Sequence, residues 1–168
     1  SGERANLIAT IGSGKPVVAV SGHMDVVNEG NHDDWTSPPF ELTERNGHLY
    51  GRGAADMKSG LAALVIAMIE IKASGQLKHG TIRLLATAGE EMEQAGSEQL
   101  YRKGYMADVD ALVIAEPSYP SIVYAHKGSM DIKITSQGRS SHSSTPFMGE
   151  NAITPLIELV QNINQAYE

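Results

Sequence analysis

Six side chains of this sequence have the types needed to hold a pair of metal ions, and most of them follow short apolar segments. Imidazole nitrogens and carboxylate oxygens are ligands that divalent transition metals accept, and two such ions side by side promote hydrolysis. The 168 residues include no cysteine, so disulfides and thiolate ligands are excluded. The six residues are His23, Asp25, Asp56, Glu90, Glu91 and Glu116.

His23 and Asp25 lie two positions apart, so on a continuing strand their side chains share a face. A neutral imidazole binds zinc well, and a nearby carboxylate orients the ring and raises its basicity. The alternative is a histidine that caps a strand end beside a solvated aspartate. The pair alone does not separate these two interpretations.

Asp56 lies among Gly51, Gly53 and two alanines. Small residues let the backbone approach a ligand closely, and a carboxylate can bridge two cations. An isolated aspartate here is also typical of a helix N-cap, and the two roles are compatible.

Glu90 and Glu91 are adjacent acids that repel one another unless a cation or water compensates their charge. One of them could bind metal while the other acts as a general base. The alternative is an acidic turn that continues to Glu93. Glu116, just before Pro117, is either a ligand or a surface turn residue.

The elements that must position these residues alternate along the chain. Apolar patterns predict strands at residues 7–11, 17–20, 81–87 and 111–115, with helices at 57–74 and 96–102. This alternation predicts an α/β fold with a mixed, largely parallel sheet flanked by helices. Ligand sites in such sheets lie beyond the carboxyl ends of the strands, where His23, Glu90, Glu91 and Glu116 fall.

The pattern changes after about Tyr124. Residues 130–135 alternate as in a half-exposed strand, a polar loop at 138–144 contains His142, and 151–167 predicts an amphipathic helix with Pro155 in its first turn. We therefore expect a first domain at residues 1–124 and the beginning of a second, α+β domain at 125–168.

The net charge of −7 argues against nucleic acid or an anionic membrane as the main partner. The most apolar segment, residues 61–71, is too short to span a bilayer, and the first four residues do not resemble a signal peptide. We expect a cytoplasmic protein, with which the absence of cysteine is compatible.

Taken in order, the motifs resemble the co-catalytic zinc amidohydrolases that include succinyl-diaminopimelate desuccinylase, acetylornithine deacetylase and glutamate carboxypeptidase. The resemblance covers nearly the whole chain and is specific as an ordered series. The matching segments are 21–27 (SGHMDVV), 51–60 (GRGAADMKSG), 88–91 (AGEE), 115–118 (AEPS) and 138–146 around His142.

The resemblance implies two zinc ions, with cobalt or manganese as possible substitutes. His23 and Glu116 would bind one zinc, Asp56 would bridge, and Glu91 would bind the second. Asp25 would orient His23, and Glu90 would be the general base. His142 would stabilise the oxyanion in a neighbouring subunit, reached through a lid domain that forms a homodimer.

The implied reaction is hydrolysis of the amide bond of an N-acyl amino acid, with an acetylated or succinylated diamino acid as substrate. A dipeptidase or carboxypeptidase on the same scaffold is the first alternative, and a non-catalytic binding or assembly domain is the second. Family members are about twice this length, and their remaining part supplies a further zinc-binding histidine. We therefore expect this chain to be a fragment that is inactive or nearly so alone.

Overall fold

The computed structural model describes residues 4–118, 121–128 and 130–167. The chain divides into two compact units, Ser1–Ile122 and Val123–Glu168, which are described separately below. Among the described residues, no helix combines the length and the apolar character needed to cross a membrane.

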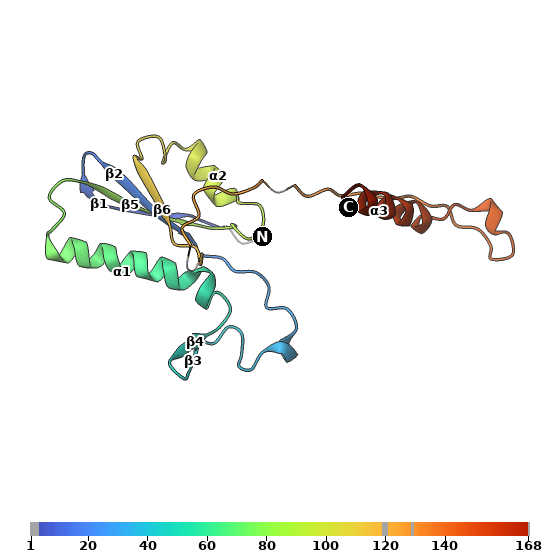
Figure 1. Cartoon of the computed structure of the whole chain (residues 1–168), viewed down its shortest axis with the longest axis horizontal. Coiled ribbons are helices and arrows are strands. Elements are labelled where there is room, and N and C mark those ends of the chain that lie inside the picture. Colours follow the sequence, from blue (N-terminus) through green and yellow to red (C-terminus); the bar gives the residue numbers. More distant parts are fainter. Residues whose placement is uncertain (1–3, 119–120, 129, 168) are drawn as a thin grey trace. The chain divides into compact units, whose positions relative to one another are not determined.

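The first unit is built on a four-stranded sheet with the order β1-β5-β2-β6 (Figure 1). The sheet is mixed, because β1 runs antiparallel to β5 whereas β2 is parallel to both β5 and β6. This arrangement confirms the predicted α/β fold with a largely parallel sheet. The strands are β1 (Leu7–Ser13), β2 (Val17–His23), β5 (Gly80–Thr87) and β6 (Ala111–Ile114).

The two central strands, β2 and β5, form the most buried part of the sheet. Their register places His23 opposite Thr87, so both strands end at the same edge. Ala19 of β2, Leu85 of β5 and Leu100 of helix α2 (Ala95–Arg102) form the buried core cluster. The continuous apolar run at residues 17–20 of β2 fits a strand that is covered on both faces.

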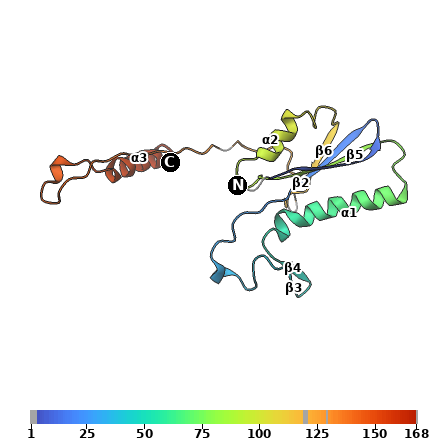
Figure 2. The ribbon, with the colours of Figure 1, turned by 180° about the vertical axis from the view of Figure 1, so that it is seen from behind.

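Helices α1 (Ser59–Ser74) and α2 lie on opposite faces of this sheet, as Figures 1 and 2 show. Helix α1 ends at Gly75, whose φ of 62° is left-handed and suits a residue without a Cβ.

The predicted start of α1 was wrong. Asp56 and Met57 have non-helical backbone angles within a preceding turn, η2 (Ala54–Lys58), and the helix begins at Ser59 with Lys58 at the N-cap position. Asp56 therefore does not cap α1. Instead the backbone bends at Asp56, and the side chain of this residue is available for the contacts described below.

Before α1, the segment after β2 includes a short 3-10 helix, η1 (His32–Asp34), and leads to a small hairpin. The hairpin consists of β3 (Thr43–Arg45) and β4 (His48–Tyr50), which pair antiparallel.

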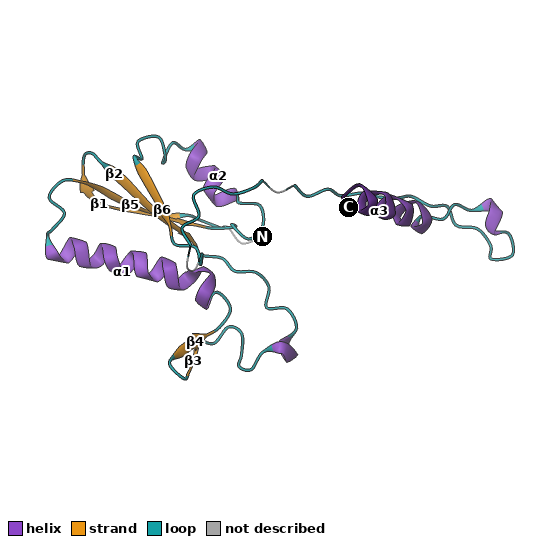
Figure 3. Ribbon diagram, in the orientation of Figure 1, coloured by secondary structure: helices purple, strands orange, loops and turns teal. Residues whose placement is uncertain are grey.

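The second unit contains a short 3-10 helix, η3 (Pro146–Met148), and helix α3 (Ile153–Tyr167). Pro155 lies in the first turn of α3, as predicted. The strand expected at residues 130–135 is absent, and Figure 3 shows this segment as loop. A strand needs a partner for its backbone groups, and the described part of this unit offers only the isolated bridge between Arg139 and Glu150.

Candidate metal centre

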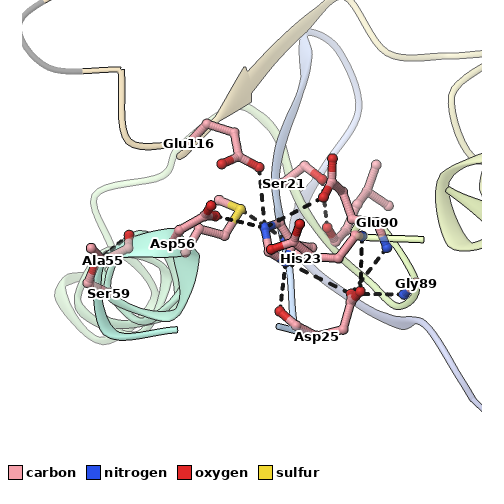
Figure 4. Close-up of polar contacts among 12 residues, drawn as sticks. Ser21, His23, Asp25, Ala55, Asp56, Ser59, Gly89, Glu90 and Glu116 are labelled. Atoms are coloured by element: carbon pink, nitrogen blue, oxygen red, sulfur yellow. Dashed lines mark hydrogen bonds and ion pairs between the residues drawn. The ribbon is translucent and has the colours of Figure 1, made fainter. Parts of the chain in front are cut away.

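The carboxyl ends of three parallel strands bring chemically active side chains to one edge of the sheet (Figure 4). His23 is the last residue of β2, Glu90 and Glu91 follow β5, and Glu116 follows β6. Asp56 comes from η2, just before α1.

His23 lies at the centre of the cluster, and its side chain is only 2% exposed. Its Nε2 atom lies 3.0 Å from Asp56 Oδ1, 3.6 Å from Glu116 Oε1 and 3.9 Å from Glu90 Oε2. One ring nitrogen therefore faces carboxylates from three separate segments.

The other ring nitrogen of His23 faces the backbone. Nδ1 lies 2.9 Å from the carbonyl oxygen of Asp25, whereas the Asp25 carboxylate is 3.9 Å away. Because a carbonyl only accepts, this contact requires Nδ1 to carry the proton and leaves the Nε2 lone pair available in the neutral ring. Strand β2 ends at His23, so Asp25 orients the ring through its main chain rather than from a shared strand face.

The Asp25 carboxylate instead holds the acidic loop after β5. It accepts hydrogen bonds from the backbone N–H groups of Gly89, Glu90 and Glu91, at 2.8, 3.2 and 3.1 Å. Partial burial would raise the pKa of Asp25, but these hydrogen bonds outweigh that effect and lower it. Asp25 therefore stays ionised and fixes the backbone that carries Glu90 and Glu91.

Close backbone packing sets the position of Glu116. A Cβ atom on Gly60, in the first turn of α1, would lie 2.3 Å from the carbonyl oxygen of Ala115. Only glycine lets α1 approach the chain this closely beside Glu116. The sequence offered a signal for this contact, because Gly60 ends the glycine- and alanine-rich segment 51–60.

The charges in the cluster are strongly unbalanced. Burial raises the pKa of Glu116, and the charges of Asp56, Glu90 and Glu91 add to this rise while His23 opposes it. Burial would lower the pKa of His23, but its hydrogen bonds to Asp25 and Asp56 and the charges of Glu116 and Glu90 raise it overall. A divalent cation among these oxygens would relieve this repulsion.

Within the described part of the chain, two overlapping sets of side chains have ligand atoms within 4.8 Å of one another, namely His23–Asp56–Glu116 and His23–Glu90–Glu91. One imidazole nitrogen with carboxylate oxygens is a donor set suited to zinc, cobalt or manganese. The residues therefore fit a metal centre. The sets share His23, whereas the sequence expectation made Asp56 the shared ligand.

His142 belongs to the second unit and is exposed. Its Nδ1 lies 2.8 Å from Ser144 Oγ, two residues away. Its role at the metal centre stays a prediction.

Comparisons with known proteins give a family match and several named relatives. A family model described as peptidase family M20/M25/M40 matches residues 19–166. A probable succinyl-diaminopimelate desuccinylase of Staphylococcus aureus is 59% identical over 164 residues, which is 98% of this chain and 41% of the relative. An acetylornithine deacetylase of Proteus mirabilis is 40% identical over 161 residues, which is 95% of this chain and 40% of the relative.

Solved structures of peptidases are similar to this chain in fold. Human carnosine dipeptidase 1 superposes with a TM-score of 0.56 at 32% identity, over 65% of this chain and 24% of that protein. Aminopeptidase PepT of Bacillus cereus, at 22% identity, shares the fold with a TM-score of 0.54 over 93% of this chain and 42% of that protein. The chain thus spans about two fifths of the length of the curated relatives that it matches.

Proposed function

The chain belongs to peptidase family M20/M25/M40, and from this premise we propose that it forms the metal-binding part of an amide hydrolase. The proposed substrate is an N-acyl amino acid, and the first choice within this class is N-succinyl-diaminopimelate. The main support for this proposal is the buried imidazole of His23, whose Nε2 faces carboxylates from three segments. The names of the two curated relatives support the deacylase assignment.

Two zinc ions are the proposed cofactors, and cobalt or manganese could replace them. His23 and Glu116 would hold one ion, Glu91 the other, and Asp56 would bridge them. Bound zinc would supply Lewis-acid polarisation of the acyl carbonyl and a more acidic water.

The chain's own groups would move the proton and position the reactants. Glu90 accepts the proton of the attacking water and passes it to the leaving amine. Asp25 holds His23 and the acidic loop in place. His142 donates a hydrogen bond to the oxyanion in a neighbouring subunit, a role supported by the resemblance around residues 138–146.

We further propose that residues 1–124 belong to the catalytic domain and residues 125–168 to the beginning of a lid through which the whole protein dimerises. The cysteine-free composition is compatible with a reducing, cytoplasmic location. Because the second zinc is expected to need a ligand beyond these residues, the chain alone should show little or no turnover.

A dipeptidase is the second candidate, because the described fold also matches human carnosine dipeptidase 1 at 32% identity. The two functions share the metal centre and differ in the group that the enzyme removes.

Calorimetric zinc titration of the chain, followed by product analysis with the whole protein that contains it, tests the proposal. We expect one tight zinc site in the chain and release of succinate from N-succinyl-diaminopimelate. Faster cleavage of N-acetylornithine or of a dipeptide would reassign the substrate. A folded chain that binds no zinc would contradict the metal centre itself.

A further inference from the structure

We propose that Met57 is a positioning residue, whose thioether sulfur accepts the backbone N–H of His23 and thereby fixes His23 relative to Asp56. The inference rests on the proposed function, because it is the metal centre that needs this spacing. Met57 was expected to be the first apolar residue of a helix, so its contact with His23 was not predicted.

The backbone N–H group of His23 needs a hydrogen-bond partner because strand β6 ends before it reaches this residue. Backbone groups of successive β2 residues point alternately to β5 and to β6. Ala115 donates to the Ser21 carbonyl on the β6 side, and Met24 donates to the Thr87 carbonyl on the β5 side. His23 therefore faces the β6 side, where β6 pairs only as far as Ser21.

Met57 occupies this position. Its sulfur lies 3.1 Å from the His23 backbone nitrogen, in a buried contact between residues 34 positions apart. A thioether is a weak acceptor, but a buried N–H without any acceptor is costly. The sulfur thus supplies the hydrogen-bond acceptor for this N–H group at a position that the main chain of β6 no longer reaches.

Packing locks the methionine in place. The side chain of Met57 is fully buried. Among the described residues, it is one of the largest fully buried side chains. A Cβ atom on Gly22 would lie 2.7 Å from Met57 Cε, so a glycine in β2 makes room for the side chain.

The covalent chain passes this constraint to the neighbouring carboxylate. Met57 follows Asp56 directly, and Asp56 Oδ1 lies 3.0 Å from His23 Nε2. The sulfur holds the backbone of one proposed ligand, while the peptide bond holds the other. Since the sulfur contacts a backbone N–H group, Met57 acts through His23 and Asp56 and not as a ligand.

Two substitutions in the 168-residue chain test this role. Met57→Leu keeps a buried apolar side chain but removes the acceptor, and Met68→Leu is a matched control at a buried methionine of α1 that is 7% exposed. Hydrogen exchange of the His23 amide is measured by NMR without metal, and zinc affinity is measured by calorimetry. Thermal unfolding corrects both for any change in stability.

We expect the His23 amide to exchange about fivefold faster in Met57→Leu than in Met68→Leu. We also expect zinc affinity to fall about tenfold in Met57→Leu and to stay unchanged in the control. If Met57→Leu does not fold, Gly22→Ala tests the same contact, because it displaces the sulfur while keeping it in the sequence.

Equal exchange and equal zinc affinity in the two methionine variants would overturn the role of Met57. The metal-free measurement keeps the two proposals apart. A wild-type chain that binds no zinc contradicts the proposed function, whereas an unprotected His23 amide in the wild-type chain contradicts the sulfur contact.

Discussion

The two units of this chain hold their polar side chains in different ways. In the first unit, the Asp25 carboxylate reaches backbone groups 64 to 66 positions away, and His23 Nε2 contacts Asp56 33 positions away. In the second unit, His142 contacts Ser144 only two positions away. None of the described residues of the second unit is buried, although α3 has a clear apolar face.

This difference shows what a site requires. A side chain at the end of a buried strand is positioned by the whole sheet, because many long-range contacts fix its backbone. A side chain on an exposed loop has only local contacts and needs a further surface to position it. We therefore expect substitutions in the first unit to disturb metal binding and folding, and equivalent substitutions in the second unit to have small effects.

The largest expected difference is between two aspartates. Asp56→Ala should weaken zinc binding by more than about 100-fold, because it removes a carboxylate that contacts His23. Asp131→Ala, at an exposed residue of the second unit, should leave zinc binding unchanged. Calorimetric titration measures both, and similar losses in the two variants would contradict the assignment of the site to the first unit.

Glu90→Gln should separate chemistry from metal binding. The amide keeps the shape of the side chain but cannot accept the proton, so amide hydrolysis by the whole protein should fall by about 10²- to 10⁴-fold. Zinc affinity should change little, and Glu93→Gln is the matched control on the same loop. A loss of zinc affinity as large as that of Asp56→Ala would make Glu90 a ligand rather than the general base.

Asp25→Asn should destabilise the first unit even without metal. Gly89 and Glu90 donate to one carboxylate oxygen and Glu91 to the other, and the Asn side chain replaces one of these oxygens with an NH₂ group that cannot accept. At least one backbone N–H group therefore loses its partner and the rest lose a charged acceptor, so the free energy of unfolding should fall by about 2 kcal/mol. Urea denaturation of the metal-free chain measures this. An unchanged midpoint would show that the acidic loop does not depend on Asp25.

The surface pair of Arg83 and Asp108 should give a smaller, pH-dependent effect. Hydrogen bonds of 2.6 and 2.9 Å to the Arg83 guanidinium lower the pKa of Asp108. A lowered folded-state pKa adds stability above the unfolded pKa, and this stability is lost as the pH falls through the folded value. In melting curves recorded from about pH 6 to about pH 2, Asp108→Asn should lose less stability than the wild type. Parallel curves would contradict this.

The smallest effect is expected for the second unit's own ion pair. Arg139 and Glu150 lie 3.4 Å apart with side chains 66% and 65% exposed, so Arg139→Ala should change the free energy of unfolding by less than about 0.5 kcal/mol. A change as large as that of Asp25→Asn in the same urea experiment would remove the contrast between the two units.

Much of the first unit could be predicted from the sequence because its strands are apolar and its polar residues follow them. The order of the strands along the chain was enough to place His23, Glu90, Glu91 and Glu116 at one edge. The prediction of a strand at residues 130–135 was wrong because the sequence pattern of this segment says nothing about a pairing partner. Alternation shows that a segment suits a sheet, but it does not supply the neighbouring strand.

The contacts that organise the centre could not be predicted from residue types. Asp25 orients His23 with its carbonyl and uses its carboxylate elsewhere, and Met57 was assigned to a helix. Both contacts depend on where β2 ends relative to β5 and β6, which is a property of the pairing and not of any one segment.

The pairing of His23 with Thr87 has one more consequence. Side chains alternate between the faces of a sheet, so a shift of β2 by one residue would turn the imidazole to the opposite face. Such a misaligned chain could still be compact and retain its secondary structure, yet its carboxylates would lack their nitrogen partner. Zinc affinity would therefore serve as a gauge of strand alignment, able to distinguish correctly folded molecules from slipped ones that circular dichroism would count as the same.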